Sequence, residues 1–538
     1  MSALEWTRRG RIALLALTLG FATGAQVADA EQHSPQVSTR FGPMRGTVED
    51  GVNVFKGIPY GAPTGGANRF RPPKTPKPWT AVRDATLFGD RCPQLSGPTG
   101  NGAWSSWVEP THASENCLVL NIWTPGVGDH KRRPVMVWLH GGGYSVSSGA
   151  SSVFDGTHLA QRGDVVVVTL NHRLNLFGYL YLGGIAGPEY ADSGNVGQLD
   201  IIAALRWIQD NIAEFGGDPA AVMIFGESGG GGKVGTLMAM PAAQGLFHRA
   251  AMQSGFAVTA LSAQAAQQMT NSLLAALHLR RGDVSRLQTI GADKLLAALQ
   301  QVTHGMPFGL GPVVDGRSLP RHPFAPDAPD VSAEVPLLVG YNKDETTALF
   351  PPAGAFDLDW SGLETLLLAQ HIGGDVAPLL RRLREIRPWA SPSDLYFTIT
   401  TERGMGRNAR AVAERKAALG RAPVYLYKLD WSTPVEGGRL RTPHSLDVPL
   451  VFDNVGRSES LIGSAAQDAQ RVADAMSAAW LAFARNGSPN APGLPSWPRF
   501  DAEQRATMVF NTVSRAVNDP LYRERQLLAP VTPAPASP

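Results

Sequence analysis

Hydrophobic residues along this chain form several short runs of strand length, and one segment between them has apolar residues at helical spacing. Runs of strand length cover residues 118–123, 135–139, 164–170 and 221–225, and they are rich in Val, Leu, Ile and aromatic residues. Before the last run, residues 200–215 carry apolar side chains three and four positions apart, which predicts a helix. This order predicts an α/β fold, in which a mostly parallel central sheet is covered by helices on both faces.

Two longer stretches interrupt this alternation. Residues 260–303 and 358–419 are expected to form helical insertions over the carboxyl edge of the sheet, above the active site. Residues 529–538 are rich in Pro, Ala and Ser and are expected to be disordered. The chain from 31 to 528 is therefore predicted to form one α/β domain with two helical insertions.

The first thirty residues have the layout of a signal peptide. Arginines within residues 8–11 precede an apolar run at 12–25, and Ala28-Asp29-Ala30 supplies a cleavage site before Glu31. The apolar run is too short to span a bilayer comfortably, although an uncleaved anchor is the alternative. The mature chain is expected to be soluble, without stable membrane insertion, and exported to the periplasm or the extracellular space.

Charge and cysteine content exclude some kinds of partner and of metal site. The 538 residues have a formal net charge of +2 and no long run of one sign, so no nucleic-acid partner is predicted. Cys92 and Cys117 are the only cysteines, which is what one disulfide needs in an oxidising compartment; two unpaired buried thiols are the alternative. Neither cysteine has a partner at C-x-x-C spacing, which excludes a zinc site, and no other metal or cofactor is predicted.

The most informative motif is Gly226-Glu227-Ser228-Gly229-Gly230. It follows the apolar run at 221–225 and precedes a helix expected over 233–240. In a G-x-S-x-G turn the chain reverses so sharply from strand to helix that glycines are needed beside the serine. The serine Oγ is then exposed at the top of the sheet. Ser228 is therefore predicted to be a nucleophile.

A serine hydroxyl needs an adjacent base, which in turn needs a carboxylate to orient it. In this architecture the partners follow in the order serine, acid, histidine, so of twelve histidines only His371 and His444 are candidates. His371 lies in a helix-forming segment, whereas His444 lies in a loop beyond the strand expected at 424–429. Because catalytic groups commonly lie on such loops, His444 is predicted to be the base.

The acid is expected directly after a strand at 335–339, where Asp344 and Glu345 are both available. Side chains of neighbouring residues point in different directions, so spacing alone does not choose between the two. A plain solvated loop is the third interpretation.

The negative oxygen of the reaction needs backbone N–H groups that converge on one point. His140-Gly141-Gly142-Gly143 directly follows a strand and matches the H-G-G-G pattern expected near a nucleophile of this type. The N–H of Gly229, at the start of the following helix, is a further donor because the helix dipole also favours negative charge there. A flexible tight turn is the alternative interpretation of the glycine run.

Together these motifs resemble the type B carboxylesterase family of α/β-hydrolases, which includes bacterial carboxylesterases. The resemblance runs from about residue 37 to 525, and it implies the α/β-hydrolase fold. Its motifs include Phe55-Lys56-Gly57-Ile58-Pro59-Tyr60, Ser114-Glu115-Asn116-Cys117-Leu118, Met252-Gln253-Ser254-Gly255 and Pro312-Val313-Val314-Asp315-Gly316.

The resemblance also implies roles for individual residues. It implies Ser228, Glu345 and His444 as a catalytic triad, which resolves the acid in favour of Glu345. The implied oxyanion donors are the N–H groups of Gly142, Gly143 and Gly229.

A disulfide between Cys92 and Cys117 is implied as well, closing a loop at the rim of the active-site gorge. Trp104 and Trp107 fall inside this loop and are candidates for lining the entrance, with surface packing as the alternative. Tyr144 and Glu227 are further candidates for the lining, and Glu227 adds either negative charge or a buried hydrogen-bond network.

Several positions depart from the family pattern. Gly229 replaces the usual alanine, and the following Gly231-Gly232-Lys233 is unusual. His172 and Asn175 replace a typical tyrosine and glycine, and Thr346 follows the acid where glycine is common. None of these changes removes a predicted catalytic group.

The sequence therefore predicts an exported serine esterase that hydrolyses small-molecule carboxylic esters through an acyl-enzyme intermediate. A non-catalytic binding or adhesion protein on the same scaffold is one alternative. A lipase, or an amide or carbamate hydrolase with the same triad, is another. The complete set of serine, acid, histidine and glycine loop argues against the pure binding protein, which needs none of them.

Overall fold

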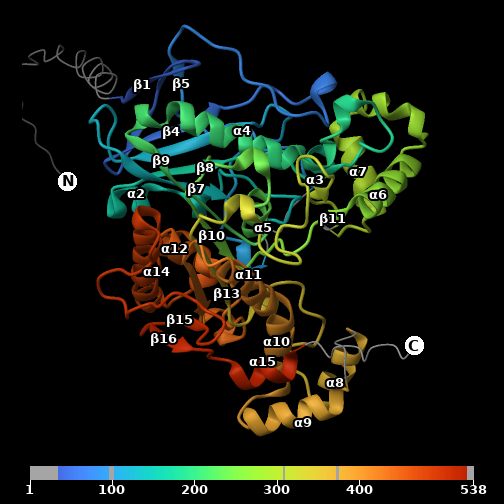
Figure 1. Cartoon of the computed structure of the whole chain (residues 1–538), viewed down its shortest axis with the longest axis vertical. Coiled ribbons are helices and arrows are strands. Elements are labelled where there is room, and N and C mark those ends of the chain that lie inside the picture. The colour runs from blue at the N-terminus through green and yellow to red at the C-terminus, as the bar shows by residue number, and fades with distance from the viewer. Residues whose placement is uncertain (1–33, 96–101, 307–308, 371–374, 530–538) are drawn as a thin grey trace, which may run out of the picture.

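The computed structural model describes residues 34–95, 102–306, 309–370 and 375–529. The predicted signal peptide at 1–30, His371 and the tail from 530 onward lie outside the described residues. Figure 1 shows the described chain as strands running through the middle of the molecule, with helices on either side.

One large sheet contains eleven strands. In spatial order they are β16 (Arg515–Asn518), β15 (Ala506–Phe510), β14 (Val424–Leu429), β13 (Leu337–Asn342), β10 (Arg249–Gln253), β9 (Gly217–Glu227), β7 (Arg133–Leu139), β8 (Val166–Leu170), β6 (Val119–Thr124), β4 (Val52–Pro59) and β3 (Thr47–Glu49). The strands from β15 to β8 pair in parallel, and antiparallel pairs complete both edges. The predicted mostly parallel sheet is confirmed.

Alternation along the central strands sends side chains into two separate cores. In β7, Val135 and Val137 are buried on one face, whereas Met136 and Trp138 are buried on the other. Successive side chains of a strand point to opposite faces, so a strand that is buried on both faces appears as an uninterrupted apolar run. This is why the central strands were the clearest elements in the sequence.

Helices cover each face of the sheet, and each contributes to the core beneath it. The core that holds Val137 also contains side chains of α4 (Val196–Asn211), α5 (Gly229–Leu237) and α11 (Arg407–Ala418). The core that holds Trp138 contains side chains of α2 (Thr157–Gly163), α12 (Asp447–Val451) and α14 (Ala466–Asn486).

Helices also occupy both stretches expected to be insertions. The first holds α6 (Ala263–Ala276) and α7 (Ala292–Val302), which form an apolar cluster with α3 (Asn175–Tyr179). The second holds α8 (Trp360–Ala369), α9 (Val376–Ile386) and α10 (Pro392–Thr401), which share a cluster with α15 (Tyr522–Leu528). In Figure 1, α6 and α7 lie at the right and α8 and α9 lie at the bottom.

Two helices begin earlier than the sequence pattern predicts. The helix expected over 200–215 starts at Val196, and the helix expected over 233–240 starts at Gly229. Glycines 229–232 have low helix propensity, which hid this start of the helix from the sequence pattern; glycine is needed there because neighbouring atoms approach too closely for side chains. A Cβ on Gly230, for example, would lie 1.9 Å from the carbonyl oxygen of Leu139.

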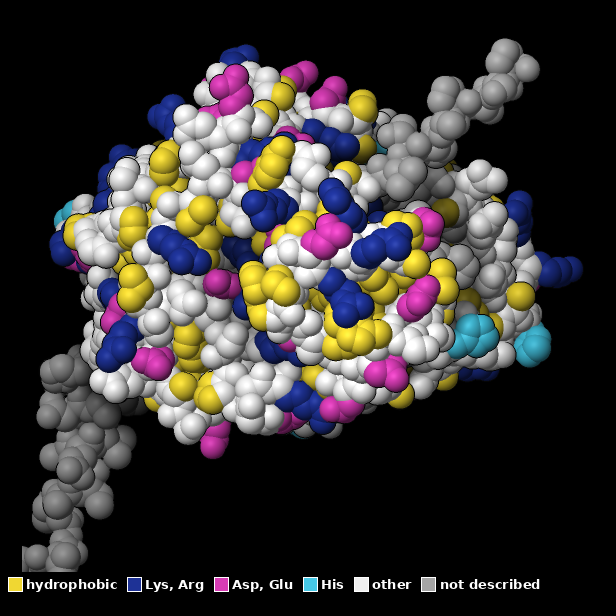
Figure 2. Space-filling view, turned by 90° about the horizontal axis from the view of Figure 1, so that it is seen from below, with side chains coloured by type: hydrophobic (Ala, Val, Ile, Leu, Met, Phe, Trp, Pro, Cys, Tyr) yellow, Lys and Arg dark blue, Asp and Glu magenta, His cyan; other side chains and the backbone are white. Residues whose placement is uncertain are grey.

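The face seen from below carries charges of both signs. Figure 2 shows Lys and Arg side chains interspersed with Asp and Glu, and hydrophobic side chains gathered near the centre. The exposed large hydrophobic residues of the chain include Leu368 on α8 and Trp389 after α9, 58% and 78% exposed. Within the described residues, every helix is too short or too polar to cross a membrane.

Candidate active site

Ser228 occupies a strained turn between β9 and α5. Its φ and ψ are 56° and −125°, a conformation that is rare for a residue with a side chain. Main-chain hydrogen bonds hold the turn: Ser228 N–H donates to Gln253 O at 2.8 Å, and Gly232 N–H donates to Ser228 O at 3.1 Å. A strained turn of this kind between strand and helix is the geometry that presents a nucleophilic hydroxyl.

Glycine is required on both sides of this turn. A Cβ on Gly226 would lie 2.6 Å from the backbone of Gly230 and 2.6 Å from Leu139 O. A Cβ on Gly255, in the loop after β10, would lie 1.6 Å from Ser228 O. The turn is therefore enclosed by main chain on all these sides, as the motif predicted.

The ring of His444, in the loop before α12, faces two buried carboxylates. Its Nδ1 lies 2.5 Å from Glu345 Oε2, and its Nε2 lies 3.1 Å from Glu227 Oε1. Burial by itself would lower the pKa of His444, but the two carboxylates outweigh burial and raise the pKa to about 9. The imidazole is thus held in a setting that favours its protonated form.

Glu345, and not Asp344, contacts the histidine. Glu345 begins a short 3₁₀ helix (Glu345–Thr347) after β13, and its Oε1 accepts the Asn342 N–H at 2.8 Å. Its Oε2 is thereby left for His444. The Asp344 carboxylate instead accepts a hydrogen bond from the backbone N–H of Thr442, at 3.4 Å. The two neighbours point in different directions, as expected, and the tertiary contact selects between them.

Glu227 lies on the other side of the imidazole, beside the serine. Its Oε1 accepts a hydrogen bond from Ser445 Oγ at 2.7 Å, and burial raises the pKa of its carboxyl group. Nε2 of His444 has no hydrogen-bond partner among the described residues. It forms an ion pair with Glu227 at 3.1 Å, so a group that approaches from the side of Ser228 would share this nitrogen with Glu227; such catalytic contacts commonly tighten only when substrate is bound.

The glycine run lies directly against the start of α5. Gly142 and Gly143 have φ values of 76° and 62°, which only glycine adopts readily. A Cβ on Gly229 would lie 2.0 Å from Gly143 O. The structure thus brings the two segments that were predicted to supply oxyanion donors into contact with each other.

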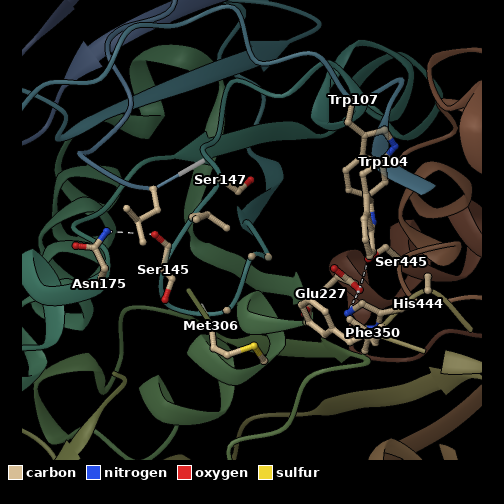
Figure 3. A pocket seen from close by; sticks show the side chains of 18 of the residues that line it. Trp104, Trp107, Ser145, Ser147, Asn175, Glu227, Met306, Phe350, His444 and Ser445 are labelled. Atoms are coloured by element: carbon tan, nitrogen blue, oxygen red, sulfur yellow. Dashed lines mark hydrogen bonds and ion pairs between the residues drawn. The ribbon is translucent and has the colours of Figure 1, made fainter. Parts of the chain in front are cut away.

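These groups meet in one cavity of about 350 Å³. Ser228, His444, Glu227 and Gly141–Gly143 line it, and most of its remaining wall is apolar. In Figure 3 the labelled residues fall into two groups, with Trp104, Trp107, His444 and Phe350 at one end and Asn175, Ser145 and Met306 at the other. The apolar lining residues are Leu95, Trp104, Trp107, Val146, Phe154, Leu299, Met306, Leu310, Ala348, Leu349 and Phe350.

The disulfide between Cys92 and Cys117 is present. Trp104 and Trp107, from the loop that it closes, both line the cavity, and Trp107 Nε1 donates to Ser458 Oγ at 2.8 Å. Tyr144 lies elsewhere. Its ring packs 5.1 Å from that of Tyr179, behind the glycine run, and it is not among the residues that line this cavity.

Two buried charged residues near the site were not recognised from the sequence. Asp447, at the start of α12, accepts hydrogen bonds from Gln253 Nε2 at 3.0 Å and from Tyr427 OH at 2.7 Å. It therefore ties the end of β10 to the middle of β14. Lys233 donates from Nζ to His140 O at 2.8 Å. The unusual lysine after the glycines was the only signal for it.

Within the described residues, no cluster of three or more His, Cys, Asp or Glu side chains is arranged to hold a metal ion. The polar groups that face the cavity are serine and threonine hydroxyls, one amide, one imidazole, one carboxyl and backbone. Chemically, this set can supply a nucleophile, a base and hydrogen-bond donors to a developing negative charge.

Comparison with known proteins agrees with this geometry. A model of the Carboxylesterase family matches residues 33–354 and 393–527. A para-nitrobenzyl esterase of Bacillus subtilis is 36% identical over 92% of this chain and 98% of its own length.

Solved structures give the same result. A carboxylesterase of Geobacillus stearothermophilus is 39% identical with a TM-score of 0.79, over 92% of this chain and 99% of that one. An esterase of Clostridium hathewayi, described as able to hydrolyse aliphatic aromatic polyesters, is 32% identical with a TM-score of 0.78, over 92% and 97%. The unmatched residues between 354 and 393 include α8 and α9.

Proposed function

Since this chain belongs to the carboxylesterase family and is a carboxylic ester hydrolase, we propose that it cleaves esters through an acyl-enzyme formed on Ser228. One observation carries the proposal. Ser228, His444 and the glycine run line the same cavity; Nδ1 of His444 is held by Glu345, and its Nε2 lies 3.1 Å from Glu227, the residue next to Ser228. This is the arrangement that nucleophilic catalysis by a serine requires.

In the first step, His444 Nε2 takes the proton of Ser228 while Oγ attacks the ester carbonyl carbon. Glu345 accepts the Nδ1 proton in a hydrogen bond, which fixes the tautomer and stabilises the imidazolium. The imidazolium then donates its proton to the leaving alcohol, and the acyl group remains on Oγ. Water, activated by the same imidazole, hydrolyses this acyl-enzyme and restores Ser228.

The N–H groups of Gly142, Gly143 and Gly229 are proposed to bind the negative oxygen of each tetrahedral intermediate. The left-handed glycine backbone and the contact between Gly143 and α5 support this role. Donors fixed before the reaction begins stabilise charge only where it develops, which lowers the barrier rather than tightening substrate binding.

The cavity favours uncharged esters with apolar groups. Its described lining includes no Lys or Arg, and the imidazole of His444 is already paired with two carboxylates, so an anionic substrate would lack a basic partner. Tryptophans 104 and 107 lie at one end, suited to an aromatic or bulky apolar group. The Bacillus subtilis relative is named for an aromatic ester, and the Clostridium hathewayi relative for aliphatic aromatic polyesters. We therefore propose small apolar or aromatic esters as the substrate class.

We also propose that the protein is exported, and two observations support this. The first thirty residues have the layout of a signal peptide, and the Cys92–Cys117 disulfide suits an oxidising compartment. N-terminal sequencing of the mature protein checks this, and a mature chain that still begins at Met1 would contradict it.

Covalent labelling tests the proposed function. The native protein, treated with a fluorophosphonate probe, should gain one label per chain on Ser228 and lose hydrolysis of p-nitrophenyl butyrate in proportion to labelling. Heat-denatured protein, in which the hydroxyl is no longer activated, should remain unlabelled. Full labelling at another residue, or activity that persists after full labelling of Ser228, would contradict the proposal.

Glu227 should set the pH dependence. The neutral form of His444 is the active base, and negative charge at Glu227 stabilises the protonated form. In Glu227→Gln the pKa of His444 should therefore fall, and the rising limb of kcat/KM should move about one unit to lower pH. The amide oxygen can still accept from Ser445, so the local structure is kept.

This shift is measured from pH 6 to 10 on a neutral ester. Glu214→Gln, which neutralises an exposed carboxylate outside the cavity, serves as the matched control and should leave the profile in place. A profile that moves to higher pH in Glu227→Gln would exclude the assigned role.

A further inference from the structure

Lys233 is a buried cation to which the proposed reaction assigns no role. It is fully buried on α5, five residues after Ser228. Its Nζ donates to the carbonyl oxygen of His140 at 2.8 Å and lies 5.7 Å from the centre of the Tyr144 ring. Burying an ammonium opposite a neutral carbonyl is unfavourable unless another interaction compensates for it. The position of Lys233 therefore requires an explanation.

The bond from Lys233 joins the helix of the nucleophile to the glycine run. The His140 carbonyl belongs to the peptide that leads into Gly141, so the bond orients the first peptide plane of the run. Glycine backbone has little conformational preference of its own, so this run depends on its anchors. At the far end, Asn175 N–H donates to Tyr144 O at 2.6 Å and Asn175 Nδ2 donates to Ser145 O at 3.2 Å. Lys233 thus supplies the anchor at the near end.

Most of the residues at which this chain departs from the family pattern surround this same segment, 140–145. The ring of His172 stacks on that of His140, with centroids 4.9 Å apart. A Cβ on Gly232 would lie 2.7 Å from Tyr144 OH, and one on Gly229 would meet Gly143. The departures that contact the segment are Gly229, Gly232, Lys233, His172 and Asn175. They contact the segment at several points along its length.

In its protonated form, Lys233 also supplies positive charge near this run. The imidazoles of His140 and His172 each use Nδ1 on a backbone carbonyl, and burial together with the charge of Lys233 keeps their pKa values well below the ordinary value. Both rings are therefore neutral. Burial lowers the pKa of Lys233 to about 7, and the charge of Glu227 opposes this by favouring the protonated form. A cation in a buried setting stabilises nearby negative charge more strongly than it would in water.

We propose that Lys233 is a positioning residue for ester hydrolysis: its Nζ holds the His140 carbonyl so that the N–H groups of the glycine run converge beside Ser228, and when Lys233 is protonated its charge also favours the negative oxygen formed there. The proposal rests on the proposed function. It assigns Lys233 to stabilisation of the transition state, and not to binding of the substrate or to folding alone.

Lys233→Met tests the proposal, because methionine has similar length but neither charge nor donor. The variant should lower kcat about 10- to 100-fold, the range expected for loss of a hydrogen bond from a charged group, and change KM less than about threefold. Affinity for a trifluoromethyl ketone, whose adduct with Ser228 carries the negative oxygen, should fall by the same factor as kcat/KM. A merely structural lysine would not produce this parallel.

Lys416→Met is the matched control. Lys416 is also fully buried, and its Nζ donates to two backbone carbonyls, Ser332 O and Ala333 O, outside the cavity. This variant should keep kcat and inhibitor affinity within about twofold per correctly folded chain. The concentration of folded sites in every variant is set by fluorophosphonate titration, so lost protein is not counted as lost catalysis.

The outcomes separate the two proposals. If the native protein is not labelled on Ser228, the proposed function fails. If it is labelled, but Lys233→Met retains native kcat and inhibitor affinity, the role of Lys233 is overturned and the proposed function stands. Should Lys233→Met not fold, Lys233→Gln decides by the same measurements, since it keeps an N–H donor and removes the charge. Native kcat in that variant would also overturn the role of the charge.

Discussion

Replacement of Ser228 by alanine is expected to lower kcat by about 10⁵- to 10⁶-fold and to leave KM nearly unchanged, because the nucleophile is lost while the cavity remains. The turn should persist, since it is held by main-chain hydrogen bonds that alanine also makes. Steady-state kinetics with p-nitrophenyl esters, together with circular dichroism of the purified variant, measure both expectations.

Ser254→Ala provides a stringent control for this variant. Ser254 is also a buried serine with positive φ, 47°, directly after β10, and its Oγ has no hydrogen-bond partner among the described residues. Removing that hydroxyl should change kcat less than about threefold. A loss of less than tenfold in Ser228→Ala, or an equal loss in both variants, would remove Ser228 from the mechanism.

Replacement of Gly229 by alanine is expected to lower kcat by about 10²- to 10³-fold, the loss typical of a displaced oxyanion donor. The added Cβ would lie 2.0 Å from Gly143 O and 2.4 Å from Gly143 C, so backbone must move. Alanine favours a helix more than glycine does by up to about 1 kcal/mol, so α5 itself should not be weakened. The loss should therefore appear in kcat rather than in thermal stability.

Gly235→Ala, in the same helix, is the control for Gly229→Ala. There the nearest atom to an added Cβ is the terminal methyl of Met252 at 2.8 Å, which can move aside. Its kcat should stay within about threefold of the native value. Unchanged kcat in Gly229→Ala would mean that Gly143 can move away from residue 229 with no effect on catalysis. It would therefore argue against the contact between Gly143 and Gly229 as part of the oxyanion site. The family resemblance makes this test informative, because alanine is the usual residue at this position.

Short-range patterns in the sequence were sufficient to predict the fold and the turn between strand and helix that holds Ser228. The family assignment made from ordered motifs is confirmed, as is the mostly parallel sheet. The glycines around Ser228 were informative because main chain approaches them within distances that no Cβ allows, a constraint that is visible in the residue type alone. The boundaries of α5 were less predictable, since the helix begins with four successive glycines, which have low helix propensity.

Long-range contacts were not predictable from local patterns. The choice of Glu345 over Asp344 depends on a contact with a histidine 99 residues away, and periodicity carries no record of it. Tyr144 illustrates the same limit, since its place in the glycine motif suggested the cavity wall, whereas its ring packs behind the run. Side-chain direction in loops is set by whichever partners the fold brings near.

By itself, then, the amino-acid sequence determined the sheet, the strained serine turn, the glycines and the pair of cysteines, because each of these is dictated by the properties of residues close together in the chain. Only the tertiary structure placed Glu227 against His444, Asp447 against Tyr427 and Lys233 against the His140 carbonyl. These buried charges meet partners from distant segments, and their chemistry depends on desolvation and on neighbouring charge, which exist only once the chain is folded.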